Sequence, residues 1–144
     1  MNVSDLIKTR RQIFAVYDQM TVHDAAKYLR EHQLRAVGVL DRDEKLVGAL
    51  SQSDISDKVA AENKCPAWMR VSEIMTRQLV TVTPETSIED CLRLMDQHSI
   101  YHLLVVDSDL GFRGMISVTD LLQLFASDQK ARADMLEALI FPIR

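Results

Sequence analysis

Two seven-residue segments combine a serine and an aspartate at a spacing that can support polar chemistry. They read Gly48-Ala-Leu-Ser-Gln-Ser-Asp54 and Gly114-Met-Ile-Ser-Val-Thr-Asp120. In each segment a carboxylate follows a serine hydroxyl by three positions, just where we expect a helix to begin. Side-chain oxygens so placed accept hydrogen bonds from the unpaired backbone N–H groups of a helix start. The same groups can bind a polar ligand, so the spacing leaves helix capping and ligand binding both open.

The two segments belong to a longer internal repeat. Asp120 follows Asp54 by 66 positions, and the same offset carries Asp41 onto Asp107. The alignment needs no gap from residue 11 to residue 55. A chain with this property consists of two copies of one structural unit.

Each copy predicts the same order of strands and helices. Short runs rich in branched apolar residues predict three strands per copy, at 13–16, 36–40 and 46–51 and at 79–82, 102–106 and 112–117. One helix follows the first strand, and another begins at the aspartate of each seven-residue segment. The order β-α-β-β-α predicts an α/β (α+β) unit with helices on one face of a sheet.

The first helix of each copy has its own start signal. Thr21 and Asp24, and likewise Ser87 and Asp90, have the spacing of a helix cap. Apolar residues then recur at helical spacing in a single stripe, so each helix should pack one face on its sheet. The stripes consist of Val22, Ala25, Ala26 and Leu29, and of Ile88, Cys91, Leu92 and Met95.

Pro66 marks the predicted boundary between the copies, because a polar stretch precedes it and proline stops a helix. The predicted domains are 1–66, 67–127 and a C-terminal helical extension at 128–144.

Short helical turns are predicted to open both copies, at residues 3–7 and 71–75. Near the C-terminus, residues 131–140 predict a helix that either caps the core or pairs with a second chain. Its apolar residues are Met135, Leu136, Leu139 and Ile140.

Bulk composition narrows the classes of function. The net charge of −4 argues against broad nucleic-acid binding, which needs clustered positive charge. No apolar run approaches the roughly 20 residues of a membrane span, and the first residues lack the pattern of a signal peptide. Cys65 and Cys91 lack the spacing of a disulfide framework, so we expect a reducing, cytoplasmic setting. The four histidines have no metal-site spacing and no nucleophile motif beside them, so we expect neither a metal site nor an enzyme.

The tandem resembles a pair of CBS domains, often called a Bateman module. The resemblance rests on two β-α-β-β-α repeats that each end in Gly-h-h-Ser/Thr-x-x-Asp, where h is apolar, and it covers almost the whole chain. It implies two units packed sheet to sheet about a pseudo-twofold axis. It also implies a homodimer formed through the helices.

In that family the aspartate at the start of the last helix accepts hydrogen bonds from ribose hydroxyls, and the serine or threonine before it contacts ribose or phosphate. The matching residues here are Ser51 and Asp54, and Ser117 and Asp120. An ionised carboxylate accepts two hydrogen bonds and so suits a vicinal diol. The resemblance therefore implies an adenosyl ligand such as AMP, ADP, ATP, NAD or S-adenosylmethionine, and no obligatory cofactor.

The two predicted sites differ. Of the family's Arg-His-h-Pro segment, which supplies basic residues near phosphates, Arg35 keeps the arginine in the first copy and His102 keeps the histidine in the second. The family's Thr-Val-x-Pro segment, which lies near the base, survives only as Thr81-Val82-Thr83-Pro84. Thr119 adds a hydroxyl beside Asp120. We therefore predict that the second copy provides the better nucleotide site.

Two functions compete at this stage. The leading interpretation is a regulatory module that binds an adenosyl ligand in clefts between the paired units and changes its assembly or its contact with a partner protein. The alternative is a constitutive dimerisation module with empty clefts, in which the motif is only a helix cap. An enzyme is the weakest interpretation, because the chain has no room for a catalytic domain beside the pair.

Overall fold

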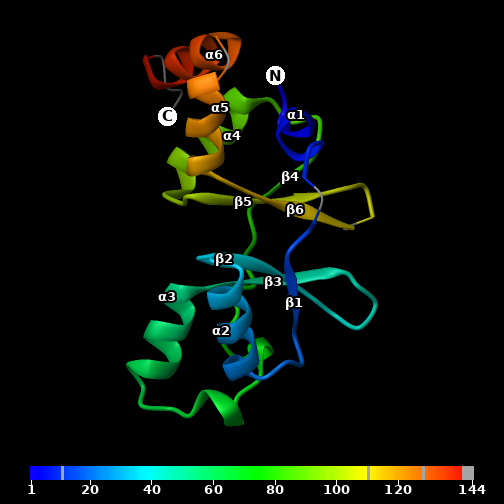
Figure 1. The fold of residues 1–144 in the computed structure, drawn as a ribbon, viewed down its shortest axis with the longest axis vertical. Coiled ribbons are helices and arrows are strands. Elements are labelled where there is room, and N and C mark those ends of the chain that lie inside the picture. Colours follow the sequence, from blue (N-terminus) through cyan, green and yellow to red (C-terminus); the bar gives the residue numbers. More distant parts are fainter. Residues whose placement is uncertain (11, 110, 128, 141–144) are drawn as a thin grey trace. The chain divides into compact units, whose positions relative to one another are not determined.

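A computed structural model describes residues 1–10, 12–109, 111–127 and 129–140. It contains two three-stranded sheets, each accompanied by helices, as Figure 1 shows. The mixed α/β class predicted from the sequence is confirmed, and the order β-α-β-β-α recurs in both repeats. The packing of one unit on the other stays a prediction.

The first sheet has the strand order β1-β2-β3, formed by Ala15–Tyr17, Ala36–Leu40 and Leu46–Ser51. β1 runs parallel to β2, which requires a crossover connection, and helix α2 (Val22–Glu31) provides it. β2 and β3 are antiparallel and joined by a short turn. Asp41 fixes this turn, because its Oδ1 accepts hydrogen bonds from the backbone N–H groups of Asp43 and Lys45 at 2.9 and 3.0 Å.

The second sheet repeats this arrangement in the order β4-β5-β6, formed by Thr81–Val82, His102–Val106 and Phe112–Ser117. The four longer strands have the predicted bounds. The first strand of each repeat is shorter than predicted and begins two residues later. In β4 the chain turns directly after Val82, where the N–H of Thr83 donates to Oγ1 of Thr86 at 3.1 Å.

The predicted helix caps are confirmed. Oγ1 of Thr21 accepts a hydrogen bond from the N–H of Asp24 at the start of α2, and Oγ of Ser87 accepts one from Asp90 at the start of α4 (Ile88–His98); both distances are 3.1 Å. Each helix buries three of its four predicted stripe residues, Val22, Ala25 and Leu29 in α2 and Ile88, Cys91 and Met95 in α4, whereas Ala26 and Leu92 are partly buried. Cys91 is fully buried in α4, as expected of a core residue.

The remaining helices differ between the repeats. The first repeat continues from β3 through α3 (Gln52–Ile55), a π-helical turn η1 (Ser56–Ala60) and a 3₁₀ turn η2 (Pro66–Trp68). In the second repeat, β6 leads into α5 (Val118–Ser127) and α6 (Gln129–Ile140), and α6 packs against α4 and α5. The short opening turns are confirmed as α1 (Val3–Ile7) and the 3₁₀ helix η3 (Val71–Glu73).

The opening segments of the repeats are exchanged. The structure divides into two compact units, and the described part of residues 1–13 belongs with the second repeat while residues 66–79 belong with the first. α1 lies beside the helices of the second repeat in Figure 1. The compact units therefore cross the repeat boundary predicted at Pro66. The predicted domain bounds, including the extension at 128–144, stay predictions.

Each unit has a core that includes part of its exchanged segment. Val3 and Ile7 of α1 pack with Val82, Leu103 and Ile116 of the second repeat. In the other core, three residues from the opening of the second repeat pack with the strands and helix of the first. They are Val71, Ile74 and Met75.

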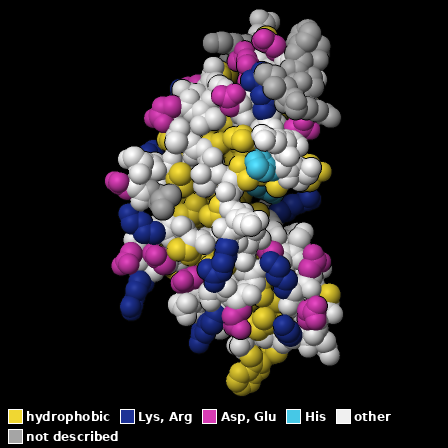
Figure 2. All heavy atoms as spheres, turned by 180° about the vertical axis from the view of Figure 1, so that it is seen from behind, with side chains coloured by type: hydrophobic (Ala, Val, Ile, Leu, Met, Phe, Trp, Pro, Cys, Tyr) yellow, Lys and Arg dark blue, Asp and Glu magenta, His cyan; other side chains and the backbone are white. Residues whose placement is uncertain are grey.

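The surface carries both basic and acidic side chains, in keeping with the small net charge of −4. On the face drawn in Figure 2, basic and acidic side chains are interspersed. Among the described residues, no helix combines the length and the apolar character needed to cross a membrane.

Candidate functional site

In the first repeat, the Ser-x-x-Asp motif forms a complete capping box. Ser51 ends β3 and is the N-cap of α3. The N–H of Asp54 donates to Oγ of Ser51 at 3.1 Å, and Oδ2 of Asp54 accepts the N–H of Ser51 at 3.0 Å. Helix capping, one of the two roles left open by the spacing, is therefore confirmed for this motif.

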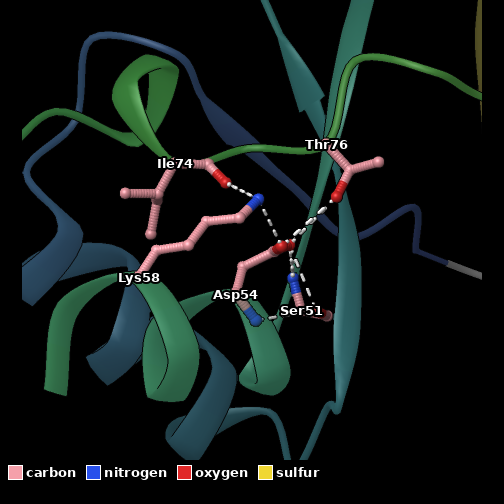
Figure 3. Close-up of polar contacts among 5 residues, drawn as sticks. All are labelled: Ser51, Asp54, Lys58, Ile74 and Thr76. Carbon is pink, nitrogen blue, oxygen red and sulfur yellow. Dashed lines mark hydrogen bonds and ion pairs between the residues drawn. The ribbon is translucent and has the colours of Figure 1, made fainter. Parts of the chain in front are cut away.

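Two further side chains donate hydrogen bonds to the Asp54 carboxylate (Figure 3). Nζ of Lys58 donates to Oδ1 at 2.9 Å, and Oγ1 of Thr76 donates to the same oxygen at 3.2 Å. The Lys58 ammonium also donates to the backbone carbonyl of Ile74 at 2.8 Å. Asp54 is only 8% exposed, so this network holds it inside the unit.

The second repeat forms the same box with different surroundings. Oδ2 of Asp120 accepts the N–H of Ser117 at 2.8 Å, and Oγ of Ser117 accepts the N–H of Asp120 at 3.2 Å. Nη2 of Arg10 donates to Oδ2 at 2.9 Å, and its Nη1 donates to the backbone carbonyl of Met115. No described residue donates a hydrogen bond to Oδ1 of Asp120. The Asp120 side chain is 29% exposed.

Asp120 and Arg10 line an open groove of about 310 Å³ in this unit. The polar side chains of Asp5, Thr9 and Gln123 also line it. The pKa of Asp5 lies below its usual value, chiefly because the backbone N–H of Asn2 donates to its carboxylate and also because of Lys8. The groove therefore presents carboxylate, guanidinium, hydroxyl and amide groups together.

The exchanged segments supply the groups that differ between the two motifs. Arg10 and Thr76 are related by the offset of 66, and each contacts the motif aspartate of the other repeat. Lys58 is related to Leu124 by the same offset. Arg10, Lys58 and Thr76 were not predicted as site residues, although the unlike residues at these paired positions were a signal that the sites differ.

Gly48 makes room for an exchanged segment, whereas Gly114 is favoured by its backbone conformation. A Cβ at Gly48 would lie 2.6 Å from Sδ of Met75, and residue 76 forms a bridge with the neighbouring Ala49. Gly114 adopts φ +124°, a conformation that L-residues with a side chain rarely adopt, and a Cβ there would meet Arg10 at 3.7 Å.

The other predicted site residues divide by their exposure. Arg35 in the first repeat, and Thr81 and Thr119 in the second, are exposed. His102 opens β5 and is half-buried. The side chain of Val82 lies in the core, which leaves only its backbone available to a ligand.

The structure gives Pro84 and Arg35 roles through their backbone carbonyls. The carbonyl of Pro84 accepts the N–H of Ser4 at 2.8 Å and so holds α1. The carbonyl of Arg35 accepts the N–H of Gln52 at 2.9 Å, and the carbonyl of Tyr101 accepts the equivalent N–H of Val118 at 3.0 Å.

The cysteines and histidines form no metal-binding cluster in the described part of the chain. There, no cluster of three or more His, Cys, Asp or Glu residues is arranged to hold a metal ion. Both cysteines are free, Cys65 exposed and Cys91 buried. Burial, with a smaller effect of the Asp90 charge, raises the pKa of the Cys91 thiol to about 12.

The comparison with protein families decides the identity of the repeat. The profile of the CBS domain matches this chain twice, at residues 3–61 and 71–127. The chain belongs to the CBS-domain family. The resemblance inferred from the two motifs is confirmed.

Known CBS proteins resemble the chain over most of its length. It is 31% identical over 124 residues to the mitochondrial CBS domain-containing protein CBSX3 of Arabidopsis thaliana, with 83% of this chain but only 60% of that protein covered. A proposed signal-transduction protein with CBS domains from Burkholderia ambifaria superimposes with a TM-score of 0.81 and 32% identity, covering 90% of this chain and 96% of that one. The CBS domain pair of protein MJ0100, in complex with 5′-methylthioadenosine and S-adenosyl-L-methionine, superimposes with a TM-score of 0.78 and 26% identity. The match covers 88% of this chain and 97% of that one.

Proposed function

We propose that the chain is a regulatory module that binds an adenosyl ligand through the motif of its second repeat. The observation that carries the proposal is the state of the Asp120 carboxylate. Its Oδ2 completes the helix cap, while its Oδ1 has no hydrogen-bond donor among the described residues and belongs to a side chain that lines a groove. A carboxylate oxygen in this state can accept hydrogen bonds from a ribose diol.

The ligand class follows from the family and from the groups beside Asp120. The CBS pair of MJ0100, which binds two adenosyl compounds, supports an adenosyl ligand here. Arg10 is ion-paired with Asp120 at 2.9 Å. A ligand with a phosphate would attract this guanidinium, since arginine pairs readily with phosphate oxygens. AMP, ADP, ATP, NAD and S-adenosylmethionine remain the candidates.

Binding would act on the rest of the molecule through the exchanged N-terminal segment. Arg10 follows α1, which the second repeat holds through Val3, Ile7 and the carbonyl of Pro84. A ligand that donates hydrogen bonds to Oδ1 of Asp120 and offers a phosphate to Arg10 would draw this guanidinium away from Oδ2 and so alter the attachment of this segment. We propose that this change modifies self-assembly or contact with a partner protein.

Calorimetry on matched variants tests the proposal. A thermal-shift panel of the five candidate ligands selects the ligand, and titration then compares Asp120→Ala with the wild type. Losing hydrogen bonds to a charged group costs on the order of 1.5–3 kcal/mol, so affinity should fall about tenfold to a hundredfold. The control is Asp57→Ala, which removes an exposed carboxylate from the end of the first repeat. Unchanged affinity in Asp120→Ala, or no binding by the wild type to any of the five, would refute the proposal.

One observation favours the alternative, a constitutive dimerisation module. Leu122 of α5 and Leu136 and Leu139 of α6 are large apolar side chains with 52%, 44% and 63% of their surface exposed. Apolar side chains grouped on neighbouring helices are common at protein interfaces. If the chain dimerises equally with and without all five ligands and binds none of them, this alternative replaces the first proposal.

A further inference from the structure

The two motif aspartates do not offer the same free acceptors. Four protein donors occupy the acceptor positions of the Asp54 carboxylate, at 2.9–3.2 Å. Oδ2 accepts from the N–H and Oγ of Ser51, and Oδ1 accepts from Nζ of Lys58 and Oγ1 of Thr76. Asp120 receives its donors on Oδ2 alone. A carboxylate has about four lone-pair positions in total, so Asp54 has none left for a ligand.

We propose that Lys58 closes the motif of the first repeat by taking the place that ribose hydroxyls would occupy on Asp54. The chain then binds one adenosyl ligand, at Asp120, and not two. The statement about ligand number rests on the function proposed above, whereas the closure of Asp54 stands on geometry alone.

Two contacts of Lys58 oppose its displacement, although its side chain is 46% exposed. Lys58 lies four residues after Asp54, a spacing that brings the two side chains together on a helix. Its ammonium bridges Asp54 and the carbonyl of Ile74, so both of its hydrogen bonds would be lost together. A ligand that displaced Lys58 would also leave Asp54, 8% exposed, without its counter-ion. Hydrogen bonds between ionised groups are the strong ones in proteins.

The second repeat has no lysine at the position that matches Lys58. The position matching Lys58 is Leu124, which has no donor and packs against the core. The position matching Thr76 is Arg10, whose side chain is 31% exposed and reaches only one carboxylate oxygen. The residues at these two paired positions differ between the repeats. The carboxylate of Asp54 is therefore closed, whereas that of Asp120 keeps an oxygen that is free of donors from the described residues.

The first experiment measures ligand number by calorimetry with AMP and with 5′-methylthioadenosine, which share the ribose diol. The wild type should bind one ligand per chain. Asp120→Ala should weaken this binding about tenfold to a hundredfold, whereas Asp54→Ala should leave it unchanged. Lys58→Met should bind two, and Lys58→Leu, which copies position 124, provides a second variant. Lys64→Met removes an exposed lysine of the same repeat and should still bind one. Two ligands on the wild type, or one on a folded Lys58→Met, would overturn the proposal.

The second experiment needs no ligand. Because Asp54 ties together Ser51, Lys58 and Thr76, we expect Asp54→Ala to lower the melting temperature more than Asp120→Ala, by at least about 4 °C. Equal losses in the two variants would overturn the closure of Asp54. If the wild type binds neither compound and none of the other four candidate ligands while this difference holds, the proposed function fails and the closure of the first motif survives.

Discussion

The exchange of opening segments can be tested at Ile74. In sequence this residue belongs to the second repeat, yet it is 2% exposed within the core of the first repeat. Ile74→Ala removes three buried carbon atoms and leaves a cavity, which costs about 2–5 kcal/mol in cores of this kind. At roughly 2–4 °C per kcal/mol for a chain near this size, the melting temperature should fall by about 4–20 °C.

Hydrogen exchange shows which unit loses stability. In Ile74→Ala the backbone amides of α2, β2 and β3 should exchange faster, because they surround the new cavity. The amides of α4 and β5 should keep most of their protection, since Ile74 lies outside their core. Ile13→Ala makes the same chemical change at a side chain that is 49% exposed and should cost much less.

Two results would refute this reasoning. One is a melting temperature of Ile74→Ala no lower than that of Ile13→Ala. The other is a larger loss of amide protection in α4 and β5 than in α2 and β2, which would mean that Ile74 supports the repeat to which it belongs in sequence.

Four further outcomes follow from the same contacts. Separate halves cut at Pro66 should be poorly folded. Backbone amides of fragment 14–79 should be better protected from hydrogen exchange than those of fragment 1–66, because the shorter fragment lacks three core residues. Equal amide protection in the two fragments would contradict this. Arg10→Gln should weaken AMP binding more than binding of 5′-methylthioadenosine, about tenfold by calorimetry if the guanidinium contacts phosphate; equal effects would remove that contact. Iodoacetamide at pH 8 should label Cys65 and spare Cys91, whose raised pKa of about 12 leaves almost no thiolate; mass spectrometry after labelling of the folded chain checks this. Leu139→Glu should shift the chain toward monomer in sedimentation, and a wild type that is monomeric at high micromolar concentration would exclude the predicted homodimer.

Local signals made much of each repeat predictable. The four longer strands have their predicted bounds because each is an apolar run bounded by turn residues, and that pattern depends on near neighbours alone. The caps at Thr21 and Ser87 were predictable for the same reason, since a cap needs only residues three positions apart. The Ser-x-x-Asp boxes also follow from local spacing, and both form as expected.

The exchange could not be predicted in this way. Val3 and Val71 lie at matching places in their repeats and are equally apolar, so nothing local says which core each one enters. The choice depends on contacts between residues distant in sequence. The bounds of β1 and β4 were misplaced because an edge strand is limited by the partner strand and by the turn that follows it.

The different surroundings of Asp54 and Asp120 also depend on contacts between residues distant in sequence. A capping box satisfies unpaired N–H groups at the helix start, so a serine and an aspartate there have a structural role in both repeats whether or not a ligand binds. The groups that decide access to the carboxylate come from elsewhere: Lys58 from one turn further along the helix, and Thr76 or Arg10 from the exchanged segment. These positions are free to differ between repeats without loss of the cap. A matched Ser-x-x-Asp pair therefore points to the family, whereas the residues at 10, 58, 76 and 124 determine how many acceptor positions of each motif carboxylate are occupied within the protein.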